Sequence, residues 1–297
     1  MQPKISIITV VYNDVAHIIE TMDSVIHQTY SHIEYILIDG ASSDGTTESI
    51  ESKIASIASI THRRESEDSL YLEARLDSNP DFSFKFLSER DTGIYDAMNK
   101  GIDLATGEWC NFMNCGDRFY NLEVLGQVVR EIEGFKKTMK DMPAVIYGDT
   151  QIMYDEQNTK ILYAAPSERK NAHKYTQRFI HQSAFIATNI AKVYRYDTKF
   201  KIMGDMAFFL EIYNKGGYVF KKITCIVCVF SAGGVSGRLS WKTFIEGCAI
   251  SFRYNVFISV YYALRYIFWV IPRVLVRNAI PNKFRNKARV IFGKKYH

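Results

Sequence analysis

The fold is decided near the start of the chain, by the stretch ISIITVVYN (Ile5–Asn13) and its counterpart YILIDGASSDGT (Tyr35–Thr46). Each begins as an apolar, β-branched run, which predicts a strand buried on both faces, and each ends in polar or glycine-rich residues, which predict a loop. A helical stretch from about Val15 to His27 lies between them, and another helix is expected from Thr46. Strands alternating with helices predict an α/β protein with a mainly parallel sheet flanked by helices.

The alternation continues along the first half of the chain. Phe84–Leu87 and Trp109–Met113 are predicted strands, and Tyr95–Leu104 is a predicted helix. The polar stretch Ser59–Asp81 is interpreted as a surface insertion whose charges face solvent. In sheets of this type, ligands bind beyond the carboxyl ends of the strands.

Composition indicates a globular protein with charge divided unevenly. The chain has 297 residues, 47% hydrophobic and 23% charged, which suits one large domain or a smaller one with an appendage and excludes disorder. Ser240–His297 contains 11 Lys and Arg against one acid, Glu246, a formal charge of +10. Since the whole chain carries +5, the first 239 residues carry −5. That acidic part is not expected to bind nucleic acid, and the asymmetry indicates two roles.

Cysteine usage indicates a reducing compartment. The five cysteines are odd in number and form no disulfide framework. Cys225 and Cys228 form a CxxC, but they lie in the apolar run Tyr218–Phe230, for which a buried strand is favoured over zinc. The N-terminus enters a strand directly and has no secretory signal pattern, so a cytoplasmic location is expected.

Polar side chains gather where the predicted strands end. Acidic residues follow the second strand at Asp39, the third at Ser88–Asp91 and the fourth at Asn114–Asp117. Such carboxylates repel one another at one sheet edge unless a cation or hydrogen-bond donors lie among them. A divalent metal with a phosphate ligand, or a base and ribose, would supply these. The alternative for Asp39 and Asp117 is an ordinary loop or helix-cap role.

Several nucleotide-binding and hydrolase motifs are absent. No GxGxxG follows the first strand, which disfavours a nicotinamide or flavin enzyme, and neither GxxxxGK[ST] nor GxSxG occurs. What remains is a sheet that binds a nucleotide through carboxylates and backbone groups, with an Asp suited to Mg²⁺ or Mn²⁺.

Four segments in order resemble one family: ISIITVVYN, YILIDGASSDGT, SERDTGIYDAMNKGI (Ser88–Ile102) and GEWCNFMNCGD (Gly107–Asp117). Over about residues 3–235 the chain resembles a family 2 glycosyltransferase of the GT-A fold, whose sheet is Rossmann-like. The similar subgroup builds bacterial exopolysaccharide, capsule or O-antigen repeat units. The resemblance implies a catalytic domain over 1–238, followed at 239–297 by a basic, aromatic-rich helical tail.

The resemblance also assigns a donor site. Asp39 is expected to accept a hydrogen bond from the uracil N3–H. The family's DxD metal motif falls on Asn114–Asp117, where only Asp117 retains a carboxylate, so Asp117 is the expected ligand of Mg²⁺ or Mn²⁺. The residues expected to bind the nucleotide sugar are Thr9, Val11, Tyr12, Asn13, Asp39, Glu89, Asp91, Asn99, Cys115 and Gly116.

The acceptor side is expected in the second half of the chain. By resemblance Asp205 is the catalytic base of an inverting transfer, and the alternative is a helix N-cap. His181, Gln182 and Ser236 are candidate contacts of acceptor or phosphate. For His181 the alternative is a structural role before a strand, and for the turn Gly233–Ser236 it is an ordinary turn.

The implied activity is transfer of one sugar from a nucleotide sugar, expected to be a UDP-sugar, to a saccharide carried on polyprenyl diphosphate. The processive QxxRW motif is not reproduced at Arg238–Trp241, which favours single addition. The stretch Val256–Val276 is interrupted by Arg265, Pro272 and Arg273, so the tail is expected to lie in the interface of the inner membrane face rather than span it. Packing of the tail on protein is the structural alternative. A sugar-nucleotide pyrophosphorylase and a non-catalytic membrane-docked binder remain the alternative functions.

Overall fold

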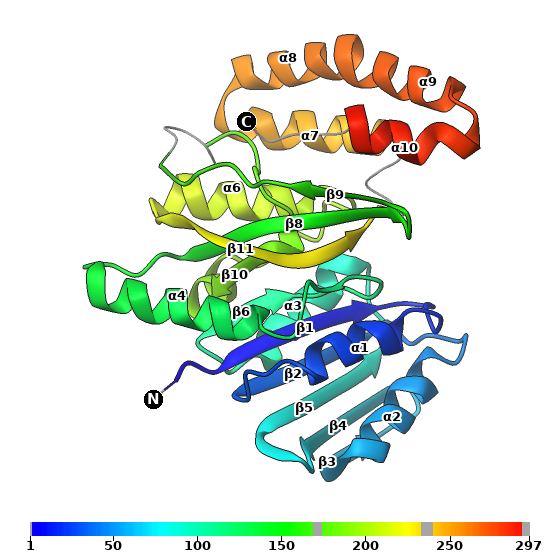
Figure 1. Cartoon of the computed structure of the whole chain (residues 1–297), viewed down its shortest axis with the longest axis vertical. Coiled ribbons are helices and arrows are strands. Elements are labelled where there is room, and N and C mark those ends of the chain that lie inside the picture. Colours follow the sequence, from blue (N-terminus) through cyan, green and yellow to red (C-terminus); the bar gives the residue numbers. More distant parts are fainter. Residues whose placement is uncertain (1, 169–173, 233–239, 293–297) are drawn as a thin grey trace.

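The computed structural model describes residues 2–168, 174–232 and 240–292. Figure 1 shows one continuous sheet with helices on its faces. The strands are β1 (Ile5–Val11), β2 (Ile33–Asp39), β3 (Ala58–Glu65), β4 (Ser69–Leu76), β5 (Asn79–Glu89), β6 (Trp109–Phe112), β7 (Arg118–Phe119), β8 (Val145–Asp155), β9 (Asn158–Leu162), β10 (Ala184–Ala187) and β11 (Phe220–Ser231). The helices are α1 (Ile18–Ile26), α2 (Thr46–Ile57), α3 (Ile94–Leu104), α4 (Val124–Thr138), α5 (Thr188–Tyr194), α6 (Gly204–Gly216), α7 (Trp241–Tyr254), α8 (Val256–Arg265), α9 (Ile271–Ala279) and α10 (Asn282–Phe292), with a π-helical turn, Tyr266–Val270, joining α8 to α9.

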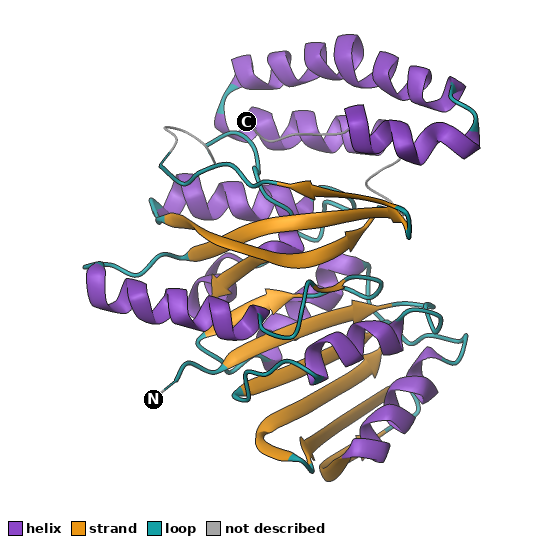
Figure 2. Cartoon of the chain, viewed as in Figure 1, coloured by secondary structure: helices purple, strands orange, loops and turns teal. Residues whose placement is uncertain are grey.

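The sheet separates two hydrophobic cores. One face of β1, carrying Ile5 and Ile7, packs against buried side chains of α1, α2 and α4. The other face, carrying Ile8 and Val10, packs against α3, α5 and α6. Because both faces are covered, the central strands are continuous apolar runs, as their sequences predict. Figure 2 shows this arrangement of helices around the strands.

The α/β fold is confirmed, and its sheet is mixed rather than mainly parallel. The strand order is β3-β4-β5-β2-β1-β6-β10-β8-β11-β7, with β9 paired to β8. The central strands β5, β2, β1 and β6 run parallel, and β8 pairs parallel with β11. The remaining pairs are antiparallel. β3 and β4 extend the edge beyond β5, β10 enters between β6 and β8 in the opposite direction, and β7 and β9 pair with β11 and β8.

The prediction for Ser59–Asp81 as a surface insertion was wrong. This stretch forms most of β3 and β4, which pair antiparallel and extend the sheet beyond β5. β3 is exposed along almost its whole length, so its charges do face solvent. In β4, alternate side chains are buried, namely Leu70, Leu72, Ala74 and Leu76. This period of two was the signal for a half-buried strand.

Cys225 and Cys228 lie in β11, and both are buried free thiols. The interpretation of this CxxC as part of a buried strand is confirmed.

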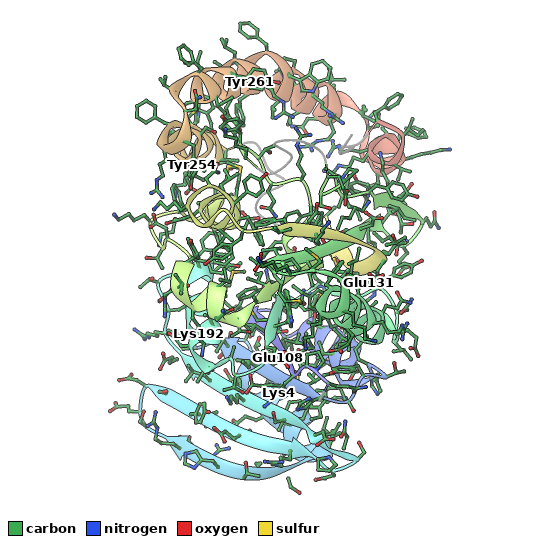
Figure 3. The ribbon with its side chains drawn as sticks, turned by 90° about the vertical axis from the view of Figure 1, so that its left-hand side faces the viewer. Lys4, Glu108, Glu131, Lys192, Tyr254 and Tyr261 are labelled. Atoms are coloured by element: carbon green, nitrogen blue, oxygen red, sulfur yellow. The ribbon has the colours of Figure 1, made fainter. Side chains whose placement is uncertain are left out.

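Helices α7 to α10 form a layer that lies over α6, β8 and β9 (Figure 1). In Figure 3, Tyr254 and Tyr261 mark this layer, which lies far from Lys4 and Glu108. At the other end of the layer, the Asn286 amide of α10 donates to the Asp155 carboxylate over 2.7 Å. The layer therefore packs on the sheet domain, while the predicted boundary at residues 238 and 239 lies outside the described residues.

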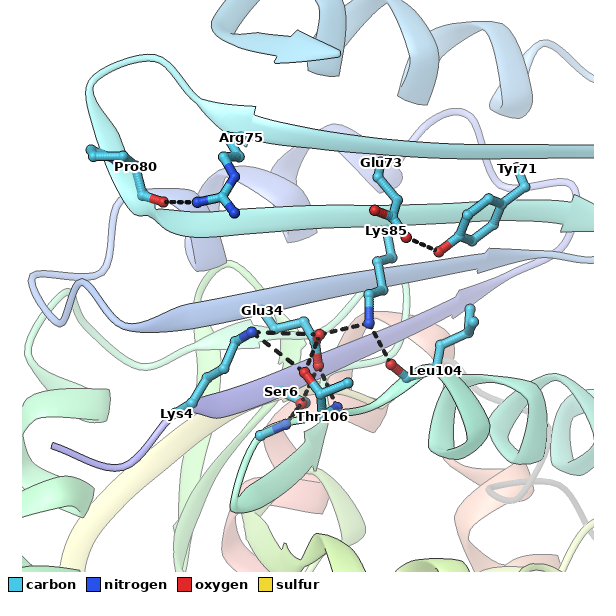
Figure 4. A network of polar contacts seen from close by, with 11 residues as sticks. Lys4, Ser6, Glu34, Tyr71, Glu73, Arg75, Pro80, Lys85, Leu104 and Thr106 are labelled. Carbon is cyan, nitrogen blue, oxygen red and sulfur yellow. Dashed lines mark hydrogen bonds and ion pairs between the residues drawn. The ribbon is translucent and has the colours of Figure 1, made fainter. Parts of the chain in front are cut away.

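A buried carboxylate ties the amino ends of the central strands together (Figure 4). Glu34 of β2 is 1% exposed and accepts from the Ser6 hydroxyl of β1 over 2.6 Å. It pairs with the Lys85 ammonium of β5 over 2.8 Å and accepts from both the backbone N–H and the hydroxyl of Thr106, each over 2.7 Å. Burial by itself would raise the pKa of Glu34, but these partners outweigh it and lower the pKa to about 2.

The first prediction concerns the pH dependence of stability. A folded-state pKa below the ordinary value of 4.5 stabilises the protein above about pH 4.5, and the contribution is lost as the pH falls to about 2. At about 1.4 kcal/mol per pKa unit, this is on the order of 3 kcal/mol. We expect Glu34→Gln to lower the free energy of urea unfolding by about that amount at pH 7, and by less at pH 3. The control is Glu65→Gln on exposed β3, and an equal loss for both variants at pH 7 would contradict the prediction.

Candidate active site at the carboxyl edge of the sheet

The parallel register brings the ends of the central strands to one edge. Val11 at the end of β1 lies opposite Asp39 at the end of β2, and Asp39 lies opposite Ser88 of β5. The loops after β1, β2 and β5 therefore lie around one edge, and the loop after β6, which pairs parallel with β1, completes it. Proximity of these loops is a consequence of the parallel pairing, not of contacts among the loops alone.

The loop after β1 carries an exposed aromatic ring and a fixed turn. Tyr12 is 67% exposed. Asn13 has a left-handed backbone, φ 50°, stabilised because its side-chain oxygen accepts from the Ser43 N–H over 2.8 Å and its own N–H donates to the Ser42 hydroxyl over 2.8 Å. These bonds join the loop after β1 to the loop after β2 and leave the Tyr12 ring at the surface.

Thr9 and Val11 lie beneath this edge, not on it. Thr9 is fully buried, and its hydroxyl donates to the Met113 carbonyl over 2.7 Å. The Val11 side chain belongs to the core that α1 covers. Both side chains point into the core below the edge. Direct contact of either side chain with a nucleotide is therefore not supported.

Asp39 organises the second loop. Its carboxylate is fully buried and accepts from the hydroxyls of Ser42, Thr47 and Ser88 over 2.5 to 2.7 Å. The Ser42 N–H also donates to it. The loop is therefore shaped by a carboxylate whose bonds are already made within the chain, and the expected bond to a uracil N3–H stays a prediction.

Gly40 lies where the loop after β2 packs tightly against its neighbours. A Cβ at this position would lie 2.7 Å from a carboxylate oxygen of Asp91 and 3.1 Å from the Tyr12 ring. Asp91 in turn accepts from the Gly93 N–H over 2.8 Å. Only a residue without a side chain lets Asp91 and Tyr12 lie so close to the backbone after β2.

Glu89 and Asn99 have partners within the chain. Glu89 pairs with the Lys100 ammonium over 2.8 Å. The Asn99 side chain exchanges two hydrogen bonds with the backbone of Tyr196, over 2.8 and 2.9 Å. Asn99 thus fastens α3 to the segment before α6, and a contact of Glu89 or Asn99 with the donor stays a prediction.

The loop after β6 turns sharply at Gly116. Gly116 has φ +87°, and the space around its missing Cβ is open. Its N–H donates to the Thr21 hydroxyl over 3.0 Å, so α1 holds the turn in place. The Cys115 thiol lies 3.5 Å from the Asp14 carboxylate, and burial raises the pKa of this thiol, which keeps it protonated at neutral pH.

Asp117 is the buried acid of this loop. It is 5% exposed, and its two oxygens accept from the Gln182 amide over 2.6 Å and from the Ser231 N–H over 3.0 Å. Burial raises the pKa of Asp117 to about 7, although both hydrogen bonds favour the charged form. Burial thus disfavours the charged form of this carboxylate, and a cation placed beside it would stabilise that form.

The residues present fit a divalent metal bound mainly by a substrate. Among the described residues, no group of three or more His, Cys, Asp or Glu side chains is placed to hold a metal ion. Asp117 would supply one hard oxygen ligand, and the neighbouring turn at Gly116 has open space around it. Mg²⁺ and Mn²⁺ accept such a site when phosphate oxygens and water complete the shell.

Asp205 lies in the first turn of α6, across from the loop after β5. The Tyr95 hydroxyl of α3 donates to the Ile202 carbonyl over 2.8 Å. A Cβ at Gly204 would lie 2.6 Å from the Tyr95 ring, so the start of α6 packs directly on α3. Asp205 accepts from the Met206 N–H over 2.8 Å, and the positive helix end favours its charge.

His181 and Gln182 point to different surroundings. The His181 ring is 6% exposed, stacks on Phe112 at 5.1 Å between centroids and bonds to the Tyr196 hydroxyl over 2.7 Å. Burial lowers the pKa of His181 to about 3, so the ring is neutral and packs as a core residue. Gln182, one residue on, bonds to Asp117 instead. Ser236, with the turn Gly233–Ser236, lies outside the described residues.

Sequence reasoning missed several residues that shape this edge. Ser42 donates to Asp39, and the Ser231 N–H donates to Asp117. The Tyr95 hydroxyl donates to the backbone of the turn before Asp205. Tyr95 was counted only as the first residue of a helix, although an aromatic hydroxyl at the start of an amphipathic helix was the available signal. For the Ser231 N–H no sequence signal exists, because any residue supplies a backbone N–H.

Known proteins identify the family. A model of Glycosyl transferase family 2 matches residues 6–198. The chain belongs to glycosyl transferase family 2. It is therefore a glycosyltransferase, which removes the pyrophosphorylase alternative.

Two relatives of this family-2 chain are mycobacterial. It is 24% identical over 279 residues to a PGL/p-HBAD biosynthesis glycosyltransferase of Mycobacterium bovis (strain BCG / Pasteur 1173P2), covering 93% of each chain. It is 29% identical over 243 residues to an uncharacterized glycosyltransferase of Mycobacterium tuberculosis (strain CDC 1551 / Oshkosh), covering 80% of this chain and 78% of the relative. Neither name indicates the exopolysaccharide, capsule or O-antigen subgroup that the motifs resemble.

Two solved structures share the fold of this family-2 chain. Staphylococcus aureus TarS 1–349 in complex with UDP has a TM-score of 0.59 at 13% identity, covering 95% of this chain and 77% of that one. Mannosyltransferase PcManGT from Pyrobaculum calidifontis, in complex with GDP-Man and Mn²⁺, has a TM-score of 0.59 at 17% identity, with coverage of 99% and 80%. The GT-A fold is confirmed.

The second prediction tests the close approach at Gly40. Because a Cβ would meet Asp91 at 2.7 Å, Gly40→Ala must displace that carboxylate or the loop. Overpacking of this kind costs about 1–3 kcal/mol, and we expect the free energy of urea unfolding to fall accordingly. The matched control is Gly134→Ala in α4, where nothing lies within 4 Å of the added Cβ and alanine favours the helix by about 1 kcal/mol. A variant at Gly40 as stable as the wild type would contradict the geometry.

Proposed function

We propose that this glycosyltransferase transfers a single sugar, with inversion, from a nucleotide sugar to a hydroxyl of a lipid-linked saccharide, in building a cell-surface glycan. The observation that carries the proposal is the gathering of Tyr12, Asp91 and Asp117 around one edge of a family-2 sheet. A site of this composition suits a ligand with a base, a ribose and a diphosphate.

The donor assignment is supported by the solved relatives. TarS 1–349 was solved with UDP and with UDP-GlcNAc, and PcManGT with GDP-Man. The shared chemistry is a nucleoside diphosphate sugar. We assign the uridine nucleotide to this chain because Asp39 ends β2, as the family pattern has it for uracil recognition, and because the exposed Tyr12 ring is free to stack on a base.

Asp117 is the proposed protein ligand of Mg²⁺ or Mn²⁺. One relative carries Mn²⁺ with its donor. When bound, the cation neutralises the charge that grows on the leaving diphosphate. Asp117 supplies one carboxylate oxygen, and its bonds to Gln182 and Ser231 fix the orientation of that carboxylate before any ligand arrives.

Asp205 is the proposed catalytic base. In an inverting transfer, the acceptor oxygen forms a bond to the anomeric carbon as the bond to the diphosphate oxygen breaks. The proton of the acceptor hydroxyl passes to the Asp205 carboxylate, and the electron pair of the broken bond leaves with the nucleotide. Asp205 suits this role because it lies in the first turn of α6, and the residues just before that helix contact the loop after β5 and α3.

The tail offers a surface for the lipid that carries the acceptor. Among the described residues, one helical run, Val256–Ala279, is long and apolar enough to cross a membrane by length and composition, and 6% of its most apolar window is buried. We propose that it lies in the membrane interface, because Arg265 and Arg273 interrupt it and the surrounding helices are basic. Its exposed apolar side chains include Phe257, Val260, Tyr261, Leu264, Phe268, Trp269, Leu275 and Val276.

A groove of about 650 Å³ lies within this tail, between α9 and α10, and is lined mainly by apolar side chains such as Phe268 and Phe292. It is distant in sequence from the candidate catalytic edge, and none of its lining residues belongs to that edge. It is part of the proposed lipid-facing surface, not the donor site.

The third prediction combines binding and turnover. Thermal unfolding is measured with UDP, GDP, CDP and ADP, each with Mn²⁺ or with EDTA. We expect UDP with Mn²⁺ to raise the Tm, since a ligand at 100 times its Kd stabilises by about 2.7 kcal/mol. Asp117→Ala should lose the Mn²⁺-dependent part of this shift. Asp205→Asn should keep the shift and lose at least about 100-fold in UDP release, as expected for a general base.

Different failures of this experiment mean different things. If no nucleotide shifts the Tm of a folded protein, the proposed donor site is wrong. If UDP binds but Asp205→Asn retains full UDP release, Asp205 is not the base. If UDP binds and no UDP-sugar is turned over under any condition, the non-catalytic binder is supported.

The fourth prediction tests the tail. Phe257 and Trp269 are 79% and 63% exposed, and burying each side chain in lipid contributes about 1.5–3 kcal/mol. We expect Phe257→Ser with Trp269→Ser to reduce sedimentation with phosphatidylcholine–phosphatidylglycerol vesicles by at least about tenfold. The matched control is Val193→Ser on α5, which is 73% exposed in the sheet domain. Equal binding by both variants would refute interfacial attachment through this face.

A further inference from the structure

The single acid of the basic tail bonds to the catalytic domain. Glu246 lies in α7, and it is the only Asp or Glu between Ser240 and His297. One of its carboxylate oxygens accepts from the Lys201 N–H over 2.8 Å. The other accepts from the N–H groups of Ile202 and Met203 over 3.0 and 2.9 Å. Three backbone N–H groups that donate to one carboxylate hold that stretch of backbone against it.

These three residues form the turn that leads into α6. Gly204 begins the helix, and Asp205 follows it directly. Three consecutive N–H groups pointing at one carboxylate determine the direction in which the chain enters the helix. The carboxylate that binds this turn belongs to a residue 41 positions after Asp205 in the chain.

The opposite side of the same turn contacts the donor half of the site. The Lys201 ammonium donates to the Thr92 carbonyl over 3.0 Å, and the Tyr95 hydroxyl donates to the Ile202 carbonyl over 2.8 Å. Thr92 follows Asp91 directly. The turn 201–203 is thus placed between the loop after β5 and α7, and Glu246 supplies its contacts on the tail side.

Packing holds α7 where Glu246 can reach. Ile250, one helical turn after Glu246, is fully buried against Met206 and Leu210 of α6. The Arg253 guanidinium pairs with Asp197 over 2.9 Å. Because Ile250 and Glu246 share one face of α7, the helix cannot shift without moving both.

We infer that Glu246 is a positioning residue that sets the Asp205 carboxylate for the transfer step. The inference rests on the proposed role of Asp205 as the base. It makes the tail a part of the active site, not only an attachment to lipid. A misplacement of a catalytic group by about 1 Å can reduce turnover by about 100-fold. Loss of the Glu246 carboxylate is therefore expected to slow the transfer step without changing the contacts to the donor.

The test compares Glu246→Gln with Glu246→Asp in the full-length protein. Glutamine keeps the shape but removes the charge, and aspartate keeps the charge but is too short to reach all three N–H groups. The matched control is Glu211→Gln, which removes a carboxylate from α6 itself, where Glu211 pairs only with the exposed Lys215 among the described ion pairs. Turnover is measured as UDP released from UDP-glucose, UDP-galactose and UDP-GlcNAc with water as acceptor.

We expect Glu246→Gln to lower kcat by about tenfold or more while the KM for the UDP-sugar stays within about twofold. Glu246→Asp should fall between it and the wild type, and Glu211→Gln should match the wild type. A parallel drop in kcat, rise in KM and loss of the UDP-dependent Tm shift would indicate a general structural role and overturn the inference. So would an unchanged kcat in Glu246→Gln.

Amide hydrogen exchange gives a readout that needs no activity. We expect exchange over residues 201–206 to rise in Glu246→Gln and to stay unchanged in Glu211→Gln. Unchanged exchange in Glu246→Gln overturns the inference even if activity falls. If exchange rises but Asp205→Asn retains full turnover, Glu246 does fix the turn and it is the assignment of the base that fails.

Discussion

The ion network around Glu34 is the constraint on which the site depends. Its carboxylate is buried at the amino end of β2, where it would be strongly unfavourable without partners. The partners come from β1, from β5 and from the turn before β6. The bonds to this one carboxylate therefore align β1, β2 and β5 with one another and with the start of β6. Parallel strands aligned at one end are aligned at the other, and it is there that the polar loops meet. The amino edge thus fixes the geometry, and the carboxyl edge is left to bind ligands.

Two buried carboxylates at that carboxyl edge have opposite surroundings. Asp39 accepts from three hydroxyls and a backbone N–H, so its charge is satisfied within the chain. Among the described residues, Asp117 accepts from one amide and one backbone N–H, and burial raises its pKa to about 7. The first arrangement shapes a loop, whereas in the second burial disfavours a charge that a bound cation would stabilise. Divergent surroundings of two similar acids indicate divergent roles.

Strands and motif residues that depend on a local sequence pattern could be predicted from the sequence. Ile5–Val11 and Ile33–Ile38 are strands because apolar β-branched runs leave few alternatives, and Asp117 was located by the motif around it. The antiparallel β10 could not be foreseen, because its direction is set by the partners it meets, not by its four residues. Thr9 was assigned to the donor since motif position does not state on which face of a buried strand a side chain lies. Glu246 was noticed only as a charge, because a carboxylate that binds backbone N–H groups leaves no pattern in the residues it binds.

Helix α7 presents different side chains on its different faces. Glu246 and Ile250 are four residues apart and face the catalytic domain, while Trp241, Ile245 and Phe252 are exposed on other sides of the helix. A rigid helix transmits displacement from one face to the other, so forces on its exposed side reach the turn 201–203. If the exposed side rests on a membrane, the approach of the lipid surface and the alignment of Asp205 are coupled by the same few hydrogen bonds. Coupling of this kind is reciprocal, so correct alignment of the turn must favour the docked tail by the free energy with which docking favours alignment.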